Sequence, residues 1–186
     1  MEYVPGGSLS SNLRQFGPLK EVLISKYTSH ILQGISYLHR NRVVHRDIKG
    51  NNVMLMPNGV IKLIDFGCAK HLNSLSNNGT HGDMLYSLLG TPYWMAPEVI
   101  SECGHGMKSE IWSIGCTVFE MATGNAPLAH MNGVQAMCYI VVAKGPMPTL
   151  SDHLSGDARE FVNLCFTRDQ HMRPSSEQLL QHAFVH

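Results

Sequence analysis

Apolar and polar residues alternate with helical spacing between about residue 18 and residue 40. The apolar members recur every three to four positions, which predicts a long helix that packs one face against a core. That face carries Leu23, Tyr27, Ile31, Ile35 and Leu38. Asn41 follows directly, and because asparagine tolerates the left-handed conformation that ends many helices, we expect it to act as the cap.

Two short runs of β-forming residues come next, at positions 53–56 and 61–64. The sequence Pro57-Asn58-Gly59 lies between them and is a strong turn signal, so an antiparallel hairpin is predicted. Residues 71–90 are rich in Asn, Ser, Gly and Thr and are expected to form a long loop. Loops of that length in a compact domain are usually functional.

The second half of the chain is predicted to be helical. Residues 109–123 are apolar on most sides, as expected for a helix at the centre of a domain, and Gly124 ends this segment. Several shorter helices are expected up to residue 186, the last of them capped by Ser175 or Ser176. Together these segments predict an α+β fold that is mainly helical and has one small β-hairpin.

Composition excludes several classes of protein. The 186 residues suffice for one domain with a hydrophobic core, and 44% hydrophobic with 15% charged residues indicates a globular chain. A net charge of zero does not suit a nucleic-acid-binding protein, no apolar run has the length of a membrane span, and the N-terminus lacks a signal-peptide pattern. The five cysteines are far apart, so we expect no disulfide framework or zinc site and a reducing, cytoplasmic location.

The predicted hairpin brings two polar side chains to its open end. If Met56 pairs with Ile61, the register puts Asn52 opposite Asp65. An amide oxygen and a carboxylate on rigid strands suit Mg²⁺, which prefers a few protein oxygens together with water and phosphate. The sequence therefore predicts a magnesium site at Asn52 and Asp65.

A second acid precedes this pair by five residues. Asp47 lies in a polar loop together with Lys49. Phosphoryl transfer needs an acid that orients a hydroxyl and cations that neutralise the charge on the phosphoryl group. The loop and the metal site together therefore favour phosphoryl transfer.

Three motifs make this chemistry specific. Residues 45–52 read H-R-D-I-K-G-N-N, residues 65–67 read D-F-G, and residues 96–98 read A-P-E. In this order and spacing, the chain resembles the Ser/Thr protein kinases over essentially its whole length. Residues 90–98 read G-T-P-Y-W-M-A-P-E, which is similar to the Ste-like kinases and especially to the MAP kinase kinase kinases of the MEKK type.

The resemblance implies a partial kinase domain at residues 1–186. Its parts would be a hinge at 1–8, a catalytic loop at 45–52, an activation segment at 65–98 and C-terminal-lobe helices at 99–186. No G-x-G-x-x-G loop or strand lysine is found before the hinge. The expected fold is thus the C-terminal lobe of a protein kinase-like fold, with the N-terminal lobe absent.

The resemblance also implies roles for five catalytic residues. Asp47 would accept or orient the proton of the substrate hydroxyl, and Lys49 would contact the transferred phosphoryl group, which indicates Ser/Thr substrates. Asn52 and Asp65 would hold the metal ions. Thr91 would brace Asp47 and the surface on which the substrate docks.

The nucleotide site is implied by the first residues of the chain. Met1 would occupy the gatekeeper position, and the Glu2 carbonyl and Val4 amide would face the edge of the adenine. Ser8 would lie near the ribose, and Met54 would form the apolar floor beneath the base. The alternative for this segment is an ordinary Pro-Gly turn.

Further family positions are structural. Glu98 would pair with Arg173 and tie the activation segment to the last helices. His45 would stack on Phe66 in an internal hydrophobic spine, next to Gly67 of the D-F-G motif.

Regulation and modification concern the activation segment. Arg46 is the type of residue that pairs with a phosphate there. Ser87 is the preferred acceptor, with Thr80 and Ser76 behind it, and the alternative is that these are solvated loop hydroxyls. For Cys68, a small buried apolar filler is favoured over a modifiable thiol.

One residue departs from the family pattern. Glu110 stands where the family usually has an aspartate that accepts backbone hydrogen bonds from the catalytic loop. Glutamate keeps the charge but adds a methylene, and a shift of about 1 Å matters for such positioning. We therefore expect Glu110→Asp to maintain or raise activity.

The function implied is an ATP- and Mg²⁺-dependent protein serine/threonine kinase that phosphorylates a MAP kinase kinase in a signalling cascade. Without the small-lobe contacts, nucleotide binding would lose on the order of 5 kcal/mol, so the fragment alone is expected to be poorly active or inactive. The alternatives are a catalytically inactive docking or scaffold module, or a truncated gene product.

Overall fold

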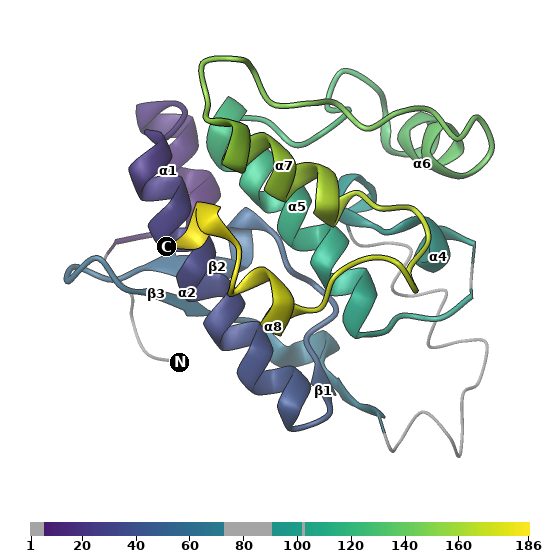
Figure 1. The fold of residues 1–186 in the computed structure, drawn as a ribbon, viewed down its shortest axis with the longest axis horizontal. Coiled ribbons are helices and arrows are strands. Elements are labelled where there is room, and N and C mark those ends of the chain that lie inside the picture. The colour runs from purple at the N-terminus through teal and green to yellow at the C-terminus, as the bar shows by residue number, and fades with distance from the viewer. Residues whose placement is uncertain (1–5, 73–90, 102) are drawn as a thin grey trace.

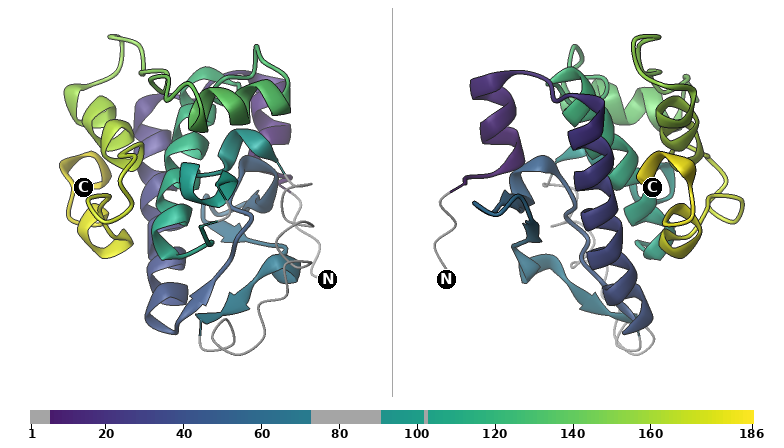
Figure 2. Two further views of the ribbon diagram at one scale, coloured as in Figure 1. Left: turned by 90° about the vertical axis from the view of Figure 1, so that its right-hand side faces the viewer. Right: turned by 60° about the vertical axis from the view of Figure 1, so that its left-hand side comes forward.

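Two long helices form the centre of the fold in a computed structural model of the chain, which describes residues 6–72, 91–101 and 103–186. Helix α2 (Glu21–Arg40) packs against helix α5 (Met107–Thr123). Figures 1 and 2 show the strands on one side of this pair and the C-terminal helices on the other. The predicted mainly helical α+β architecture is confirmed, and its assignment to a kinase lobe remains a prediction.

The remaining elements are short. They are α1 (Leu9–Phe16), β1 (Val43–Val44), β2 (Val53–Leu55), β3 (Ile61–Leu63), β4 (Lys70–His71), α4 (Pro97–Ile100), α6 (Gly133–Val141), α7 (Gly156–Cys165) and α8 (Ser176–Leu179), with 3-10 turns at Gly50–Asn52, Phe66–Cys68, Pro92–Trp94 and Ala183–Val185. The strands form two antiparallel pairs, β1 with β4 and β2 with β3. Within the described ranges, no helix is both long enough and apolar enough to span a bilayer.

The buried face of α2 is displaced from the predicted stripe. Leu23 is 39% exposed, whereas Ile24 is 1% exposed, and Thr28 and Leu32 are fully buried. Ile31 and Ile35 are buried as predicted. Helix α2 packs against both α5 and β3, so its buried face is broader than the predicted stripe. The added positions each lie one residue after a predicted one, as Ile24, Thr28 and Leu32 do.

Both ends of α2 also differ from the prediction. The helix begins at Glu21, three residues after the predicted start, because the Leu19 amide donates to Met121 O (2.9 Å) and holds the preceding backbone against α5. At the other end, Asn41 has φ −86°, and Arg42 adopts the left-handed conformation at φ 56°. Asn41 is the C-cap, as predicted, and its side chain donates to Tyr37 O (2.8 Å), but the left-handed residue is Arg42 and not Asn41.

The predicted hairpin exists, but its register differs by one residue. Leu55 pairs with Ile61, so Met56 does not, and Asn52 lies opposite Ile64 and not Asp65. The cause is the loop, because Met56 N donates to Val60 O (2.8 Å) and closes a three-residue turn. Gly59 supplies the left-handed residue of this turn at φ 74°, as three-residue hairpin loops require.

The helical second half follows the sequence prediction closely. Helix α5 is buried along most of its length and ends at Gly124, which is left-handed at φ 79°. Ser175 caps α8 by accepting a hydrogen bond from Gln178 N (3.2 Å). Of the two cap candidates, Ser175 is therefore the one used.

Helix α1 was not predicted. Its sequence contains Ser10, Ser11 and Asn12, which are weak helix formers. The helix is stabilised from outside, because the Ser8 hydroxyl accepts from Ser11 N (3.1 Å) as the N-cap and Leu9 and Leu13 are buried in the core.

Candidate active site

Asp47 is held by hydrogen bonds and an ion pair in the loop between β1 and β2. Asn52 Nδ2 donates to both Asp47 Oδ2 and Asp47 O, each at 2.8 Å. Lys49 Nζ lies 2.9 Å from Asp47 Oδ2 and also donates to Thr91 Oγ1 (2.9 Å). The structure thus brings together four of the five residues predicted to be catalytic, with the Asp47 and Lys49 side chains about one-fifth exposed, at 22% and 18%.

The Asn52 amide is oriented by these bonds. Both hydrogens of Nδ2 are directed at Asp47, so the Oδ1 oxygen is the part of the amide that remains to act as a metal ligand. Amide oxygens of this kind suit Mg²⁺.

Asp65 lies just beyond the open end of the hairpin, one residue after Ile64. Ile64 N donates to Asn52 O (3.0 Å), which lies just before β2. Asp65 comes directly after this backbone hydrogen bond. Asp65 is left-handed at φ 64°, and its Oδ1 accepts from Gly67 N (3.3 Å). A non-glycine residue in this conformation requires support from its surroundings, and such residues cluster at functional sites.

The predicted contact between His45 and Phe66 is present. The ring centroids lie 4.8 Å apart with an interplanar angle of 55°, a tilted arrangement. His45 is fully buried and its Nε2 is 3.0 Å from Ile64 O, whereas Phe66 is 49% exposed. The contact connects the catalytic loop to the segment that follows β3.

Glu110 anchors the start of the catalytic loop from helix α5. Its side chain is fully buried, and Oε1 accepts from Arg46 N (2.7 Å) while Oε2 lies 2.7 Å from His39 Nε2. His39 Nδ1 is in turn 3.3 Å from Ser176 Oγ in α8. Because the glutamate already reaches both partners, we expect no gain of activity from Glu110→Asp.

Glu98 and Arg173 form a buried ion pair. Arg173 donates to the two carboxylate oxygens at 2.7 and 3.1 Å, and Ser109 Oγ adds a third bond at 2.9 Å. Burial acts to raise the pKa of Glu98, but the hydrogen bonds and charge of Arg173 outweigh it, so the pKa lies below its ordinary value. The Arg173 guanidinium also lies over the Trp112 ring, 5.3 Å from its centroid. The pair joins the A-P-E segment to the C-terminal helices.

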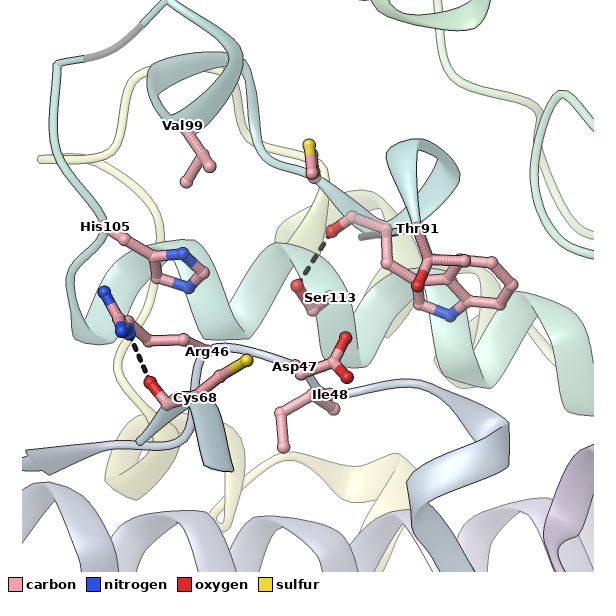
Figure 3. A pocket seen from close by; sticks show the side chains of 10 residues that line it. Arg46, Asp47, Ile48, Cys68, Thr91, Val99, His105 and Ser113 are labelled. Carbon is pink, nitrogen blue, oxygen red and sulfur yellow. Dashed lines mark hydrogen bonds between the residues drawn. The ribbon is translucent and has the colours of Figure 1, made fainter. Parts of the chain in front are cut away.

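A pocket opens beside Asp47, between the catalytic loop, the residues after the D-F-G motif and helix α5 (Figure 3). Arg46 lines it and donates through Nε to Cys68 O (2.5 Å). Cys68 is exposed, so the buried-filler interpretation was wrong, because the chain at this point lies at the surface and not in the core.

His105 also lines this pocket, although no sequence motif points to it. Its Nε2 is buried without a hydrogen-bond partner among the described residues, and burial lowers the pKa of the imidazole. Nothing in its sequence surroundings, Gly104-His105-Gly106, distinguishes it from the other scattered histidines.

The nucleotide-binding prediction is only partly within the described residues. Ser8 and Met54 lie side by side in an isolated antiparallel bridge, and the Ser8 hydroxyl serves as the α1 cap. The other predicted nucleotide-binding and phosphate-accepting residues lie outside the described ranges: Met1, Glu2, Val4, Ser76, Thr80 and Ser87.

Comparison with known proteins gives consistent matches along the whole chain. A model of the protein kinase domain matches residues 1–185. The chain is 65% identical over 185 residues to mitogen-activated protein kinase kinase kinase 19 of Homo sapiens, covering 100% of this chain and 14% of that protein. It is 45% identical over 185 residues to mitogen-activated protein kinase kinase kinase A of Dictyostelium discoideum, covering 100% and 19%.

A plant relative extends this pattern. The chain is 46% identical over 186 residues to mitogen-activated protein kinase kinase kinase 3 of Arabidopsis thaliana, covering 100% of this chain and 29% of that protein. The chain therefore spans less than a third of the length of each of these three relatives. Since the family model covers all but the last residue of the chain, the chain belongs to the protein kinase family and resembles its MAP kinase kinase kinases.

Proposed function

We propose that this chain carries the catalytic loop of an ATP-dependent protein serine/threonine kinase whose substrate is a MAP kinase kinase. The observation that carries the proposal is the Asp47 cluster, in which Asn52 and Lys49 fix one carboxylate at 2.8 and 2.9 Å. Kinase catalysis depends mainly on positioning and on neutralising charge, and this cluster supplies groups for both.

In this proposal Asp47 orients the hydroxyl of a substrate serine or threonine and accepts its proton. The hydroxyl oxygen bonds to the γ-phosphorus of ATP as the bond to the leaving ADP breaks. Lys49, whose ammonium lies between Asp47 and Thr91, neutralises charge on the transferred group. Thr91 fixes this lysine and so brings the activation segment into the site.

Magnesium would be held by Asn52 and Asp65. The Oδ1 of Asn52 and the carboxylate of Asp65 would supply hard oxygen ligands of the kind that Mg²⁺ prefers. A magnesium ion held there would supply positive charge that neutralises the phosphates of ATP.

The substrate class rests on the relatives, whose names make them kinases of MAP kinase kinases. The proposed boundaries of the hinge (1–8), catalytic loop (45–52), activation segment (65–98) and following helices (99–186) rest on the same family pattern. A cytoplasmic location fits a kinase of this cascade and the separated cysteines.

Calorimetry of Mg·ATP binding to the full-length protein tests the proposed metal site at Asn52 and Asp65. The expected result is binding that Asp65→Ala weakens at least about tenfold and that the exposed control Asp152→Ala leaves unchanged, since Asp152 is 94% exposed. Equal binding by wild type and Asp65→Ala would contradict the metal assignment.

Phosphotransfer by the full-length protein to a purified MAP kinase kinase tests the rest of the proposal. Asp47→Ala should lower kcat by at least about 100-fold while the KM for ATP stays nearly constant, because Asp47 acts on the hydroxyl and not on the nucleotide. A folded wild-type protein that binds no nucleotide and transfers no phosphate would favour a docking module instead.

A further inference from the structure

A second buried carboxylate touches the catalytic loop and belongs to none of the motifs. Glu120, near the end of α5, is only 5% exposed. Its Oε1 accepts from Ser10 Oγ (2.6 Å) in α1, and its Oε2 accepts from Gly50 N (3.2 Å) in the 3-10 turn Gly50–Asn52. One side chain thus joins α1, α5 and the loop that carries Lys49 and Asn52.

The packing around Gly50 leaves no room for a side chain. A Cβ at this position would lie 2.5 Å from Ser10 Oγ and 2.6 and 2.7 Å from the two oxygens of Glu120. Contacts this short do not occur, so any larger residue would force the carboxylate and the loop apart. The glycine lets the backbone come within hydrogen-bond distance of Glu120, and a proline would lack the N–H that the carboxylate accepts.

Gly50, which donates to Glu120, lies in the sequence between Lys49 and Asn52, the two residues that contact Asp47. Gly50 directly follows Lys49, and Asn52 N donates back to Lys49 O (2.9 Å) to close the turn. Fixing the Gly50 amide therefore fixes the backbone from which both Lys49 and Asn52 reach Asp47. A small displacement of such groups has a large effect on rate.

A purely structural role explains this arrangement poorly. Burying a carboxylate is costly unless hydrogen bonds satisfy it, and an apolar residue would fill the same space at lower cost. Among the described residues, the charged group acting on Glu120 is Arg14, and the acceptors are used instead for a hydroxyl and a backbone amide of the catalytic loop.

We infer that Glu120 is a positioning residue for catalysis, which acts through Gly50 to hold Lys49 and Asn52 in place around Asp47. The inference rests on the proposed kinase function. It assigns to Ser10 the supporting role of keeping the carboxylate turned toward Gly50.

Amide exchange measured by NMR on the 186-residue chain tests the bond without any assay of activity. Glu120→Gln keeps the shape but offers one acceptor to two donors, so exchange at the Gly50 and Asn52 amides should become about tenfold faster. Ser10→Ala should give a smaller increase at the same amides and serves as the milder variant. Glu160→Gln, at a side chain that is 67% exposed, is the matched control and should change neither amide. Unchanged exchange at both amides in Glu120→Gln would overturn the inference.

Steady-state kinetics of the full-length protein test the consequence. Glu120→Gln should lower kcat about tenfold and leave the KM for ATP within about twofold. Because both changes act on one contact, Gly50→Ala combined with Glu120→Gln should be no worse than the more damaging single variant, whereas independent effects would multiply.

The outcomes separate the two claims. A kcat that falls only in proportion to the unfolded fraction, or multiplicative effects in the double variant, would overturn the positioning role. A wild-type protein without phosphotransfer would refute the proposed function. The exchange rate of the Asn52 amide in Glu120→Gln would then show by itself whether Glu120 orders the loop.

Discussion

Glu110 and Glu120 lie ten positions apart on helix α5, and each accepts a backbone N–H from the catalytic loop. Glu110 takes the Arg46 amide at the start of the loop at 2.7 Å, and Glu120 takes the Gly50 amide in its middle at 3.2 Å. The second partner differs, because Glu110 also meets His39, whereas Glu120 meets the hydroxyl of Ser10.

The difference shows that one helix anchors the loop in two ways. At Glu110 both partners are tightly placed, and His39 passes the connection on to Ser176 in α8. At Glu120 one partner is a hydroxyl that can rotate, and the position of the loop depends on the absence of a side chain at Gly50. The first anchor is therefore expected to contribute more to stability and the second mainly to the placement of Lys49 and Asn52.

The largest expected effect comes from removing the first anchor. Glu110→Ala leaves the Arg46 amide and the Nε2 atom of His39 without their partner in the core and creates a cavity, so it should destabilise the fold by about 3–4 kcal/mol. Glu120→Ala should cost about 2 kcal/mol, since its bond to the Gly50 amide is longer, at 3.2 Å, and its other partner is a neutral hydroxyl. Urea unfolding of both variants measures the difference, and equal losses would show that the two anchors are alike.

Removing the second partner of each glutamate should give smaller effects in the same order. His39→Ala leaves a buried Glu110 oxygen without its donor and should cost about 2 kcal/mol, whereas Ser10→Ala should cost about 1 kcal/mol. Thermal unfolding at fixed pH checks the order. A larger loss in Ser10→Ala would reverse the comparison.

The pH dependence of stability distinguishes Glu120 from the ion-paired Glu98. Burial raises the pKa of Glu120, with Ser10, Gly50 and Arg14 acting in the opposite sense. A raised pKa means that its favourable contribution is complete below the unfolded value of about 4.3 and is lost as pH rises through the folded value. The pKa of Glu98 is lowered in the folded protein. Its favourable contribution to stability is therefore present above the unfolded pKa of about 4.3 and is lost as pH falls through the folded pKa.

Unfolding free energies measured between about pH 2 and pH 7 test these signs. Relative to Glu120→Gln, the wild-type protein should lose stability as pH rises. Relative to Glu98→Gln, it should gain stability as pH rises from more acidic values. If the unfolding free energy of the wild-type protein increased with pH relative to that of Glu120→Gln, the raised pKa of Glu120 would be contradicted.

The smallest effect is expected at the surface beside the first anchor. Arg40 and Glu177 form an ion pair of 3.9 Å whose side chains are 65% and 64% exposed. Glu177→Gln should change the unfolding free energy by no more than about 0.5 kcal/mol, because solvent screens such pairs. A larger change would mean that the contact between α2 and α8 depends on surface charge as well as on His39 and Ser176.

Sequence reasoning succeeded where local chemistry decides the structure. The Pro57-Asn58-Gly59 turn, the Gly124 end of α5 and a serine cap at 175 or 176 follow from the sequence, because each depends on the conformational preference of one or two residues. Asn52, Lys49 and Asp47 were likewise selected before the structure showed them in contact.

What the sequence could not give depends on contacts between distant segments. Helix α1 forms from weak helix formers because its buried face meets the rest of the domain. The hairpin register is a separate, local case, because the turn signal does not say which pair of residues closes the loop. The role of Glu120 cannot be predicted from the sequence, because its partners Gly50 and Ser10 are 70 and 110 residues away and a glutamate near the end of a helix is ordinarily exposed.

The bond between Ser176 and His39 has a consequence for how the protein is made. The two residues are 137 positions apart, and the chain emerges from the ribosome at about 5–20 residues per second. His39 therefore waits roughly 7 to 27 seconds before Ser176 in α8 is synthesised and can complete its support. During synthesis the segment around Asp47 therefore emerges well before the helix that completes its support, which makes this interval the one in which a chaperone would have most to protect.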